Sequence, residues 1–238
     1  MAVSAACAST GWALNGALSN GISFAHFPIE AQRELWGDGA DPFSCACFAP
    51  TGTAAPTDGG YVLSGKWSFA SGCDHSSWVR LGAFITAPSN TPSHDGAFFL
   101  LPIGDVEIED NWFACGLSET GSKNIIVHEA FVSQHRVLRF ADTRSGRTPG
   151  ARHHKNPLYR LPLLVLGATM LASTAVGAAK GALESYLAMT SGRTTRGALA
   201  GGGLAIADRI RCRRNQAYAT KLALEAVETL NARPAAMA

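Results

Sequence analysis

Charged residues are scarce in this sequence of 238 residues. Asp, Glu, Lys and Arg together make up 16% of the chain, against roughly a quarter in typical soluble domains. The 20 basic and 18 acidic residues nearly cancel, leaving a net charge of +2. Nucleic acids and anionic membranes attract proteins through a broad excess of positive charge, so this balance argues against both partners. A surface with so little charge is expected to be covered in part by other subunits.

Several common catalytic and metal-binding signatures are also missing. The sequence has no G-x-S-x-G turn, no Walker loop and no G-x-G-x-x-G after a strand, which argues against hydrolases, P-loop enzymes and Rossmann dehydrogenases. Its six cysteines are irregularly spaced and no secretory signal is evident, so we expect a cytoplasmic protein. Cys45-x-Cys47, Cys73-x-His75 and His153-His154 are too small to form a set of three or four ligands, so no metal is predicted.

Long hydrophobic runs are rare too, with one exception. Residues 161–179 carry no charge over a length that could span a bilayer. The run is rich in Ala, Gly, Ser and Thr, and Pro162, Lys180 and Glu184 lie at its borders. Small residues also allow close helix packing, so we interpret the run as a buried bundle helix.

Helical patterns occur at both ends of the chain. Trp12, Leu14 and Leu18 recur at helical spacing, and residues 28–35 place a proline and an acid in a first helical turn. After a polar loop, a long helix is predicted from Asn156 to about Thr190, and a second from about Leu204 to Leu230. Their apolar faces need partners, which suggests an incomplete helix bundle.

Between these ends the pattern changes to short strands separated by turns. The turn at residues 57–60 precedes Tyr61–Ser64, residues 78–81 alternate in polarity, 97–101 are apolar and 125–127 are β-branched. We therefore predict an α+β fold with a central antiparallel β barrel or sandwich. The predicted boundaries are a partial N-terminal helical domain (1–40), the β domain (41–140), a linker (141–156) and the first helices of a C-terminal four-helix bundle (157–238).

Three segments of the β domain carry the most specific pattern: residues 45–52, 59–72 and 116–122. Their order and spacing resemble the acyl-CoA dehydrogenase superfamily, whose chains run from a helical domain through a β domain to a four-helix bundle. Residues 63–75 are closer to the oxygenase components of two-component flavin monooxygenases, such as the hydroxylases of 4-hydroxyphenylacetate and of a phenolic secosteroid. Residues 9–12, 30–37 and 156–162 also resemble that branch.

The resemblance implies a flavin site in the β domain. It places the isoalloxazine ring of reduced FMN or FAD against Phe69, Ala70 and Ser71, with Phe69 covering the ring and the Ser71 hydroxyl near N5. It places Cys47 and Phe48 at the pyrimidine side of the ring. The reduced flavin would come from a separate reductase, and the other partner would be a small aromatic or heteroaromatic substrate.

Other positions leave alternatives open or depart from the family pattern. Arg193 lies where the superfamily directs an arginine toward the flavin phosphate; the alternative, which is equally open for Arg193 and for Arg196, is an ordinary solvated residue. Asn20 stands where the oxygenases usually have a histidine that deprotonates or positions the phenol; Asn can orient a substrate but is not a base. His26 is nearby but out of register, which favours a packed or surface role.

The resemblance also bears on completeness and assembly. The chain ends before the last bundle helices, so it looks truncated at both ends, and the C-terminal catalytic residue lies beyond Ala238. As a full-length protein we expect an enzyme, a flavin-dependent monooxygenase that forms a homotetramer. Two alternatives are an acyl-CoA dehydrogenase-like flavoenzyme with tightly held FAD, and a catalytically incomplete flavin-fold fragment.

Overall fold

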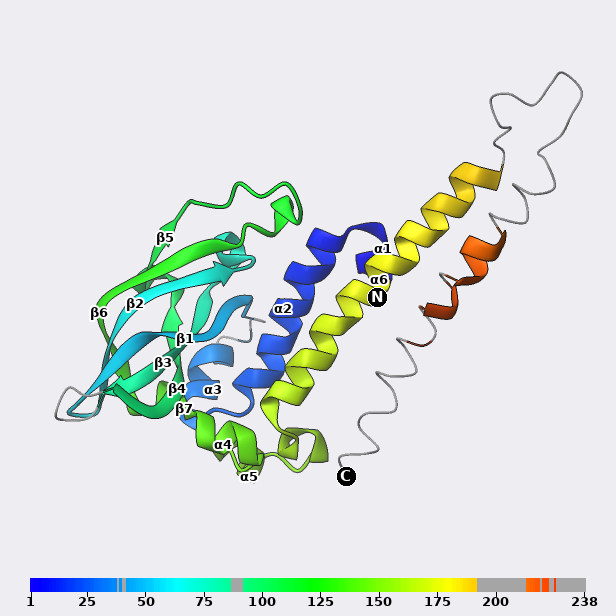
Figure 1. Ribbon diagram of the computed structural model, residues 1–238. Helices are drawn as coiled ribbons and strands as arrows, with labels where there is room; N and C mark the ends of the chain where they lie inside the picture. Colours follow the sequence, from blue (N-terminus) through cyan, green and yellow to red (C-terminus); the bar gives the residue numbers. More distant parts are fainter. Residues whose placement is uncertain are drawn as a thin grey trace, which may run out of the picture. The chain divides into compact units, whose positions relative to one another are not determined.

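The computed structural model describes residues 1–37, 39, 42–86, 92–191, 213–218, 220–222 and 225 (Figure 1). They divide into two compact units, which we describe separately. The sheet unit is Trp12–Leu171, and the helical unit combines Met1–Gly11 with Ala172–Ala238. Arg193 and Arg196, together with the glycine-rich link between the two predicted bundle helices, lie outside the described residues.

A seven-stranded sheet in the order β5-β6-β2-β1-β3-β4-β7 forms most of the sheet unit (Figure 1). Its strands are β1 (Ser44–Thr57), β2 (Gly60–Ala70), β3 (Trp78–Thr86), β4 (Pro92–Pro102), β5 (Glu107–Glu109), β6 (Lys123–Ser133) and β7 (Val137–Arg139). The predicted antiparallel barrel or sandwich is corrected here, because the sheet is not closed and β1 pairs with β3 in parallel. Alternating polarity marks strands but not which distant strand each one joins.

The α-helices are α1 (Ala2–Ala6), α2 (Ala8–Phe24), α3 (Ile29–Trp36), α4 (Phe140–Ser145), α5 (Pro149–His153) and α6 (Leu163–Ser191). Short 3-10 turns are η1 (Cys73–His75), η2 (Ile103–Asp105), η3 (Ser118–Thr120), η4 (Gln134–Arg136) and η5 (Pro157–Arg160). The long helix predicted from Asn156 begins only at Leu163, since the Asn156 side chain caps η5 by accepting from Leu158 N (2.9 Å). Residues 213–218 and 220–222 are helical, as predicted. No helix within the described ranges is long and apolar enough to cross a bilayer.

Strand β4 shows how the sheet unit is built. Its residues alternate between the two faces of the sheet. Ala97, Phe99 and Leu101 join the larger hydrophobic core, while Phe98 and Leu100 join a second core with apolar side chains of α2 and α3. The sheet is thus buried on both faces here, which explains the uninterrupted apolar run at 97–101.

Trp67 is the largest side chain of the main core and is 1% exposed. Its indole Nε1 donates to Gly82 O (2.6 Å). The ring lies directly over Gly52, where a Cβ atom would come within 2.0 Å of ring atom Cζ2. The pairing of this indole with a glycine on the neighbouring strand therefore leaves no room for a side chain at position 52.

His26 is a packed residue, one of the two alternatives given above, and is fully buried. Its Nδ1 is 3.0 Å from Thr148 Oγ1, and its ring meets Tyr159 edge-on. Burial, and then the electrostatic influence of nearby Arg80 and His154, lower the pKa of His26 from 6.5 to about 4. The folded protein therefore holds this imidazole neutral in a pH range where the unfolded chain protonates it.

We expect this histidine to make the protein acid-sensitive. Because the folded pKa lies below the unfolded one, stability is complete above about pH 6.5 and falls as the pH drops toward 4. Between pH 7 and pH 5 the loss should be about 2 kcal/mol in free energy of unfolding. Urea unfolding at both pH values measures it, with His26→Gln as the variant that cannot titrate. An equal loss in the variant would contradict this assignment.

Candidate active site

One cavity of the sheet unit collects most of the predicted site residues. Its volume is about 330 Å3. Its lining comes from five parts of the chain: Trp12, Gly16, Ser19 and Asn20 of α2; Ala46, Cys47 and Phe48 of β1; Ser68, Phe69 and Ser71 at the end of β2; Trp112, Leu117 and Ser122 before β6; Gly167 and Leu171 of α6. The walls are mainly aromatic and aliphatic, with a few amide and hydroxyl groups. Such a lining suits a flat aromatic ligand with a polar edge.

Ser71 is held by a chain of hydrogen bonds at the cavity wall. Thr120 Oγ1 donates to Leu117 O (2.8 Å), so it can only accept from Ser122 Oγ, 2.6 Å away. Ser122 Oγ must then accept from Ser71 Oγ at 2.7 Å. Trp12 Nε1 donates to Ser71 Oγ (3.0 Å). Since a hydroxyl has one proton and two lone pairs, Ser71 is left with one lone pair, which can accept from an N–H group of a ligand.

Phe69 and Phe48 provide aromatic surface to the cavity. Phe69 is 64% exposed, unusual for a phenylalanine, and its ring contacts that of Trp112 edge-on, with centroids 5.8 Å apart. Phe48 meets Phe98 in the same way at 5.9 Å. Ala70, which was predicted with them, is buried in the main core and does not line the cavity. Its neighbours Ser68 and Phe69 both line it, because the pairing of β2 with β6 is irregular between Trp67 and Ala70 and strict alternation is lost there.

The cysteines near the cavity are buried and unreactive. Burial raises the pKa of the Cys45 thiol to about 12, and raises that of Cys47 still further. Both therefore remain protonated at neutral pH, and a protonated thiol is neither a good nucleophile nor a good metal ligand. Among the described residues, no three His, Cys, Asp or Glu side chains are grouped as metal ligands would be.

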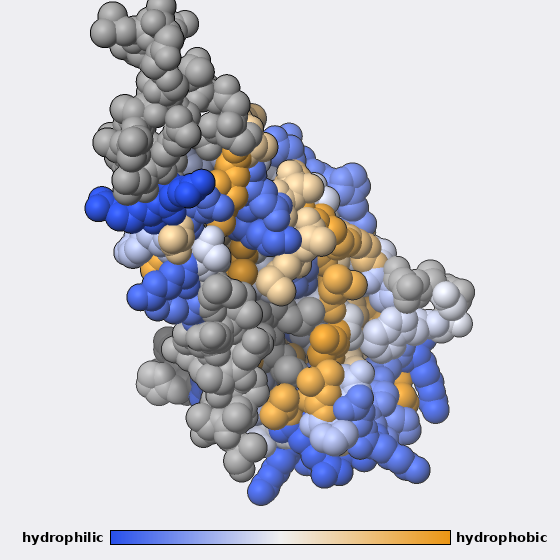
Figure 2. Space-filling view, turned by 90° about the vertical axis from the view of Figure 1, so that its right-hand side faces the viewer, coloured by the Kyte–Doolittle hydropathy of each residue, from blue (hydrophilic) through white to orange (hydrophobic). Residues whose placement is uncertain are grey.

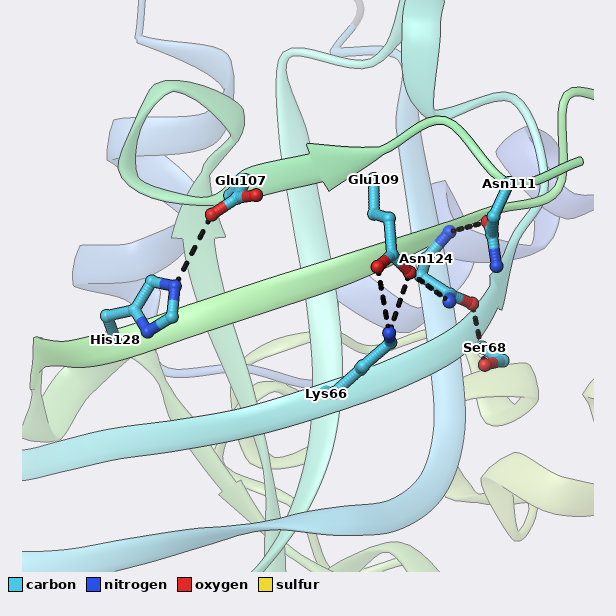
Figure 3. Close-up of polar contacts among 7 residues, drawn as sticks. All are labelled: Lys66, Ser68, Glu107, Glu109, Asn111, Asn124 and His128. Carbon is cyan, nitrogen blue, oxygen red and sulfur yellow. Dashed lines mark hydrogen bonds and ion pairs between the residues drawn. The ribbon is translucent and has the colours of Figure 1, made fainter.

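Ser68 is connected to the protein surface by a polar network (Figure 3). Its Oγ donates to Asn124 Oδ1 (2.7 Å), and Asn124 Nδ2 donates to Glu109 Oε2 (2.7 Å). Glu109 in turn pairs with Lys66 at 2.7 Å, and hydrogen bonds from Lys66 and Asn124 lower the pKa of Glu109. Asn111 Oδ1 accepts from Asn124 N. With its proton directed at Asn124, Ser68 also offers only an acceptor to the cavity.

Asn20 is fixed by two hydrogen bonds. Its Nδ2 donates to Ser44 O and its Oδ1 accepts from Nη2 of Arg80, both at 3.0 Å. Arg80 is fully buried, and its guanidinium carbon lies 4.7 Å from the ring centroid of Phe48 and 5.0 Å from that of Phe98. Burial lowers the pKa of Arg80 to about 9, so it stays charged at neutral pH.

The structure thus brings together Asn20, Cys47, Phe48, Phe69 and Ser71 of the predicted residues. Arg193 lies outside the described residues. The main residues without a predicted role are Trp12, Ser68, Trp112, Ser122 and Arg80. Trp12 and Ser68 lie in segments that resemble the oxygenases, and Ser122 lies in a segment that resembles the wider superfamily, so a signal was available for all three. Arg80 alternates with apolar neighbours, a pattern typical of a solvent-facing strand residue.

Comparisons with known proteins give a consistent result. No protein-family model matches the chain. Over 207 residues it is 45% identical to the oxygenase component of an FADH2-dependent resorcinol hydroxylase from Rhizobium sp. (strain MTP-10005), which covers 87% of this chain and 50% of that protein. Over 199 residues it is 34% identical to the oxygenase subunit HsaA of a flavin-dependent monooxygenase from Rhodococcus jostii, covering 84% and 51%. The chain spans about half the length of these curated relatives.

Solved structures agree with the sequence comparison. The crystal structure of 3-HSA hydroxylase from Rhodococcus sp. RHA1 superimposes with a TM-score of 0.79 at 29% identity, covering 96% of this chain and 68% of that one. The relatives and structural neighbours named here are hydroxylases and monooxygenases, with the acyl-CoA dehydrogenase-like fold expected from the sequence.

Proposed function

Because these relatives are oxygenase components of flavin-dependent monooxygenases, we propose that this chain acts as one, hydroxylating a small phenolic substrate with reduced flavin and O2. The observation that carries the proposal is the cavity in which Ser71 presents a free acceptor between the aromatic side chains of Phe48, Phe69 and Trp112. The acyl-CoA dehydrogenase-like alternative has no comparable support in this cavity.

The cavity residues fit a reduced flavin. A reduced isoalloxazine ring carries an N–H group at N5, and the lone pair left on Ser71 is an acceptor for it. Phe69 would cover the ring, with Cys47 and Phe48 at its pyrimidine side, and Arg193 would bind the phosphate. When bound, the reduced flavin supplies the two electrons with which one oxygen atom of O2 enters the substrate and the other leaves as water. The apolar walls would keep bulk water from the ring.

The partners follow from the same proposal. An oxygenase component needs a separate reductase to deliver reduced flavin. The similar resorcinol hydroxylase is named as FADH2-dependent, so reduced FAD is the first candidate for the cofactor and reduced FMN the second. We further propose that α6 belongs to a four-helix bundle and that the protein is a homotetramer. Exposed apolar side chains on α6, such as Tyr186 and Met189, support this, and Figure 2 shows hydrophobic residues at the molecular surface. The free cysteines favour the cytoplasm as its compartment.

Binding of reduced flavin is the direct test. Titrated without oxygen, the chain should bind reduced FAD and quench the fluorescence of Trp12 and Trp112, which line the cavity. Supplied with resorcinol, NADH and a flavin reductase under labelled O2, it should form a product with one labelled oxygen atom on the ring, detectable by mass spectrometry. Omission of the reductase is the control and should give no product. Failure to bind either reduced FAD or reduced FMN would overturn the proposal.

A further inference from the structure

Arg80 carries a charge that none of the described residues neutralises. Among the buried residues that the structure describes, it alone bears a charge at neutral pH, and it is 0% exposed. Its Nη2 donates to Asn20, while Nε and Nη1 have no hydrogen-bond partner. No described carboxylate forms an ion pair with it, and burial is the sole cause of its lowered pKa. The nearby titratable groups, His26 and the thiols of Cys45 and Cys47, are all uncharged at neutral pH.

Such an arrangement is unfavourable unless an anion completes it. A buried cation loses its hydration, and proteins normally compensate it with a carboxylate and a full set of hydrogen bonds. The rings of Phe48 and Phe98 offer some compensation through their π faces. They leave the net positive charge in place, so the field of Arg80 extends into whatever space lies next to it.

That space is the cavity, since two residues in contact with Arg80 line it. Phe48 and Asn20 both form part of the cavity wall, and Arg80 contacts the ring of the first and the amide oxygen of the second. Asn20 uses its Oδ1 for Arg80 and one Nδ2 proton for Ser44 O. Its second Nδ2 proton remains for a ligand, and the donation from Arg80 to Oδ1 polarises the amide and strengthens that donor.

We propose that Asn20 and Arg80 together bind the substrate hydroxyl as its anion: Asn20 donates to the phenolate oxygen, and the buried guanidinium behind it supplies the compensating charge. This inference rests on the proposed oxygenase function and names the chemical form of its substrate. The proton of the phenol is released to solvent on binding, so no protein base has to accept it. A phenolate ring is richer in electrons than a phenol and reacts faster with an electrophilic oxygen donor.

The inference explains how a site with Asn20 activates a phenol. An amide cannot accept the proton at neutral pH. A fixed positive charge close to an acid favours its ionised form instead, typically by tenfold or more when the separation is about 4 to 6 Å. Asn20 is therefore the residue that touches the substrate, and Arg80 is a positioning residue that acts through it.

The test uses 4-nitrophenol, whose phenolate absorbs at a longer wavelength than the neutral phenol. Spectra recorded from acid to alkaline pH give the ionisation constant of the bound probe. In the wild-type chain we expect that constant to be at least about tenfold larger than for free 4-nitrophenol. Arg80→Met and Asn20→Asp, which remove or neutralise the charge, should each abolish the increase. Arg152→Met, at an exposed arginine, is the matched control and should retain it.

Stability measurements make the result decisive. If Arg80 serves substrate binding and does not stabilise the fold, the Arg80→Met variant should unfold at the same temperature as wild type or higher. In that variant an unpaired buried charge is replaced by an apolar side chain. If Arg80→Met does not fold, Asn20→Asp decides, since it keeps the arginine in place. An unchanged ionisation constant in the wild-type chain, or a full increase in Asn20→Asp or a folded Arg80→Met, overturns the inference. Binding of reduced FAD, measured separately, tests the proposed function itself.

Discussion

Replacing Ser71 with tryptophan is expected to weaken binding of reduced flavin by about 100-fold or more, a loss of about 3 kcal/mol. An indole at this position would occupy much of the 330 Å3 cavity and would break the hydrogen-bond chain from Trp12 to Thr120. Anaerobic calorimetry with reduced FAD measures the effect. Thermal unfolding should show that the variant retains its fold, because the indole enters a cavity rather than a packed core.

Two further variants separate volume from hydrogen bonding. Ser71→Ala keeps the space but removes the acceptor, so it should cost about 1 kcal/mol, or about fivefold in affinity. Ser145→Trp places the same bulky side chain at an exposed position in α4 that does not line the cavity. This variant should bind reduced flavin with the wild-type affinity. Binding of reduced flavin to Ser71→Trp with the wild-type affinity would show that the flavin site lies elsewhere in the protein.

Trp67→Ala is expected to destabilise the sheet unit by about 3 to 5 kcal/mol, the usual cost of removing a large buried aromatic side chain. The variant leaves a cavity beside Gly52 and also loses the hydrogen bond from Nε1 to Gly82 O. Domains of this size have only about 5 to 15 kcal/mol of stability, so much of the chain would unfold at elevated temperature. Urea unfolding followed by circular dichroism measures the change.

The control for this variant is Phe113→Ala. Phe113 is 88% exposed, so its removal should change the free energy of unfolding by less than about 0.5 kcal/mol. The loss of unfolding free energy for Trp67→Phe should lie between those for Trp67→Ala and Phe113→Ala, because phenylalanine keeps part of the buried aromatic surface but lacks the indole N–H. A loss below about 1 kcal/mol for Trp67→Ala would mean that the indole is not packed as the structure shows.

Much of the cavity was predictable, for reasons that differ from residue to residue. Phe69 and Ser71 lie in one short segment that resembles the oxygenases, and the structure places both side chains at the cavity. Ala70, predicted with them, is buried in the main core instead, at the end of an irregular stretch of β2 that runs from Trp67 to Ala70. Sequence resemblance located the segment, whereas the contacts of each side chain depended on its orientation in the strand.

The hydrogen-bond chain behind Ser71 shows what could not be predicted. Trp12 and Ser71 are 59 positions apart, and Ser71 and Ser122 are 51 apart. Taken individually, a serine before a strand and a tryptophan in a helix have ordinary structural explanations. Only the pairing of β2 with β6 brings residues 71 and 122 together. The donor and acceptor roles of the three hydroxyl groups in this hydrogen-bond series then depend on one local contact, the hydrogen bond that Thr120 donates to the Leu117 carbonyl.

By itself, the sequence determined the order of helical and strand-rich segments, the segments that resemble flavin-dependent oxygenases and the scarcity of charge, because side-chain periodicity and turn residues act over a few neighbouring positions. Tertiary structure alone decided that the sheet stays open and that β1 and β3 are parallel. It also made Arg80, one residue of an alternating strand pattern in the sequence, a buried cation that is hydrogen-bonded to Asn20. These outcomes depend on which distant segments pack together, and burial, not residue type, sets the energy of a charge.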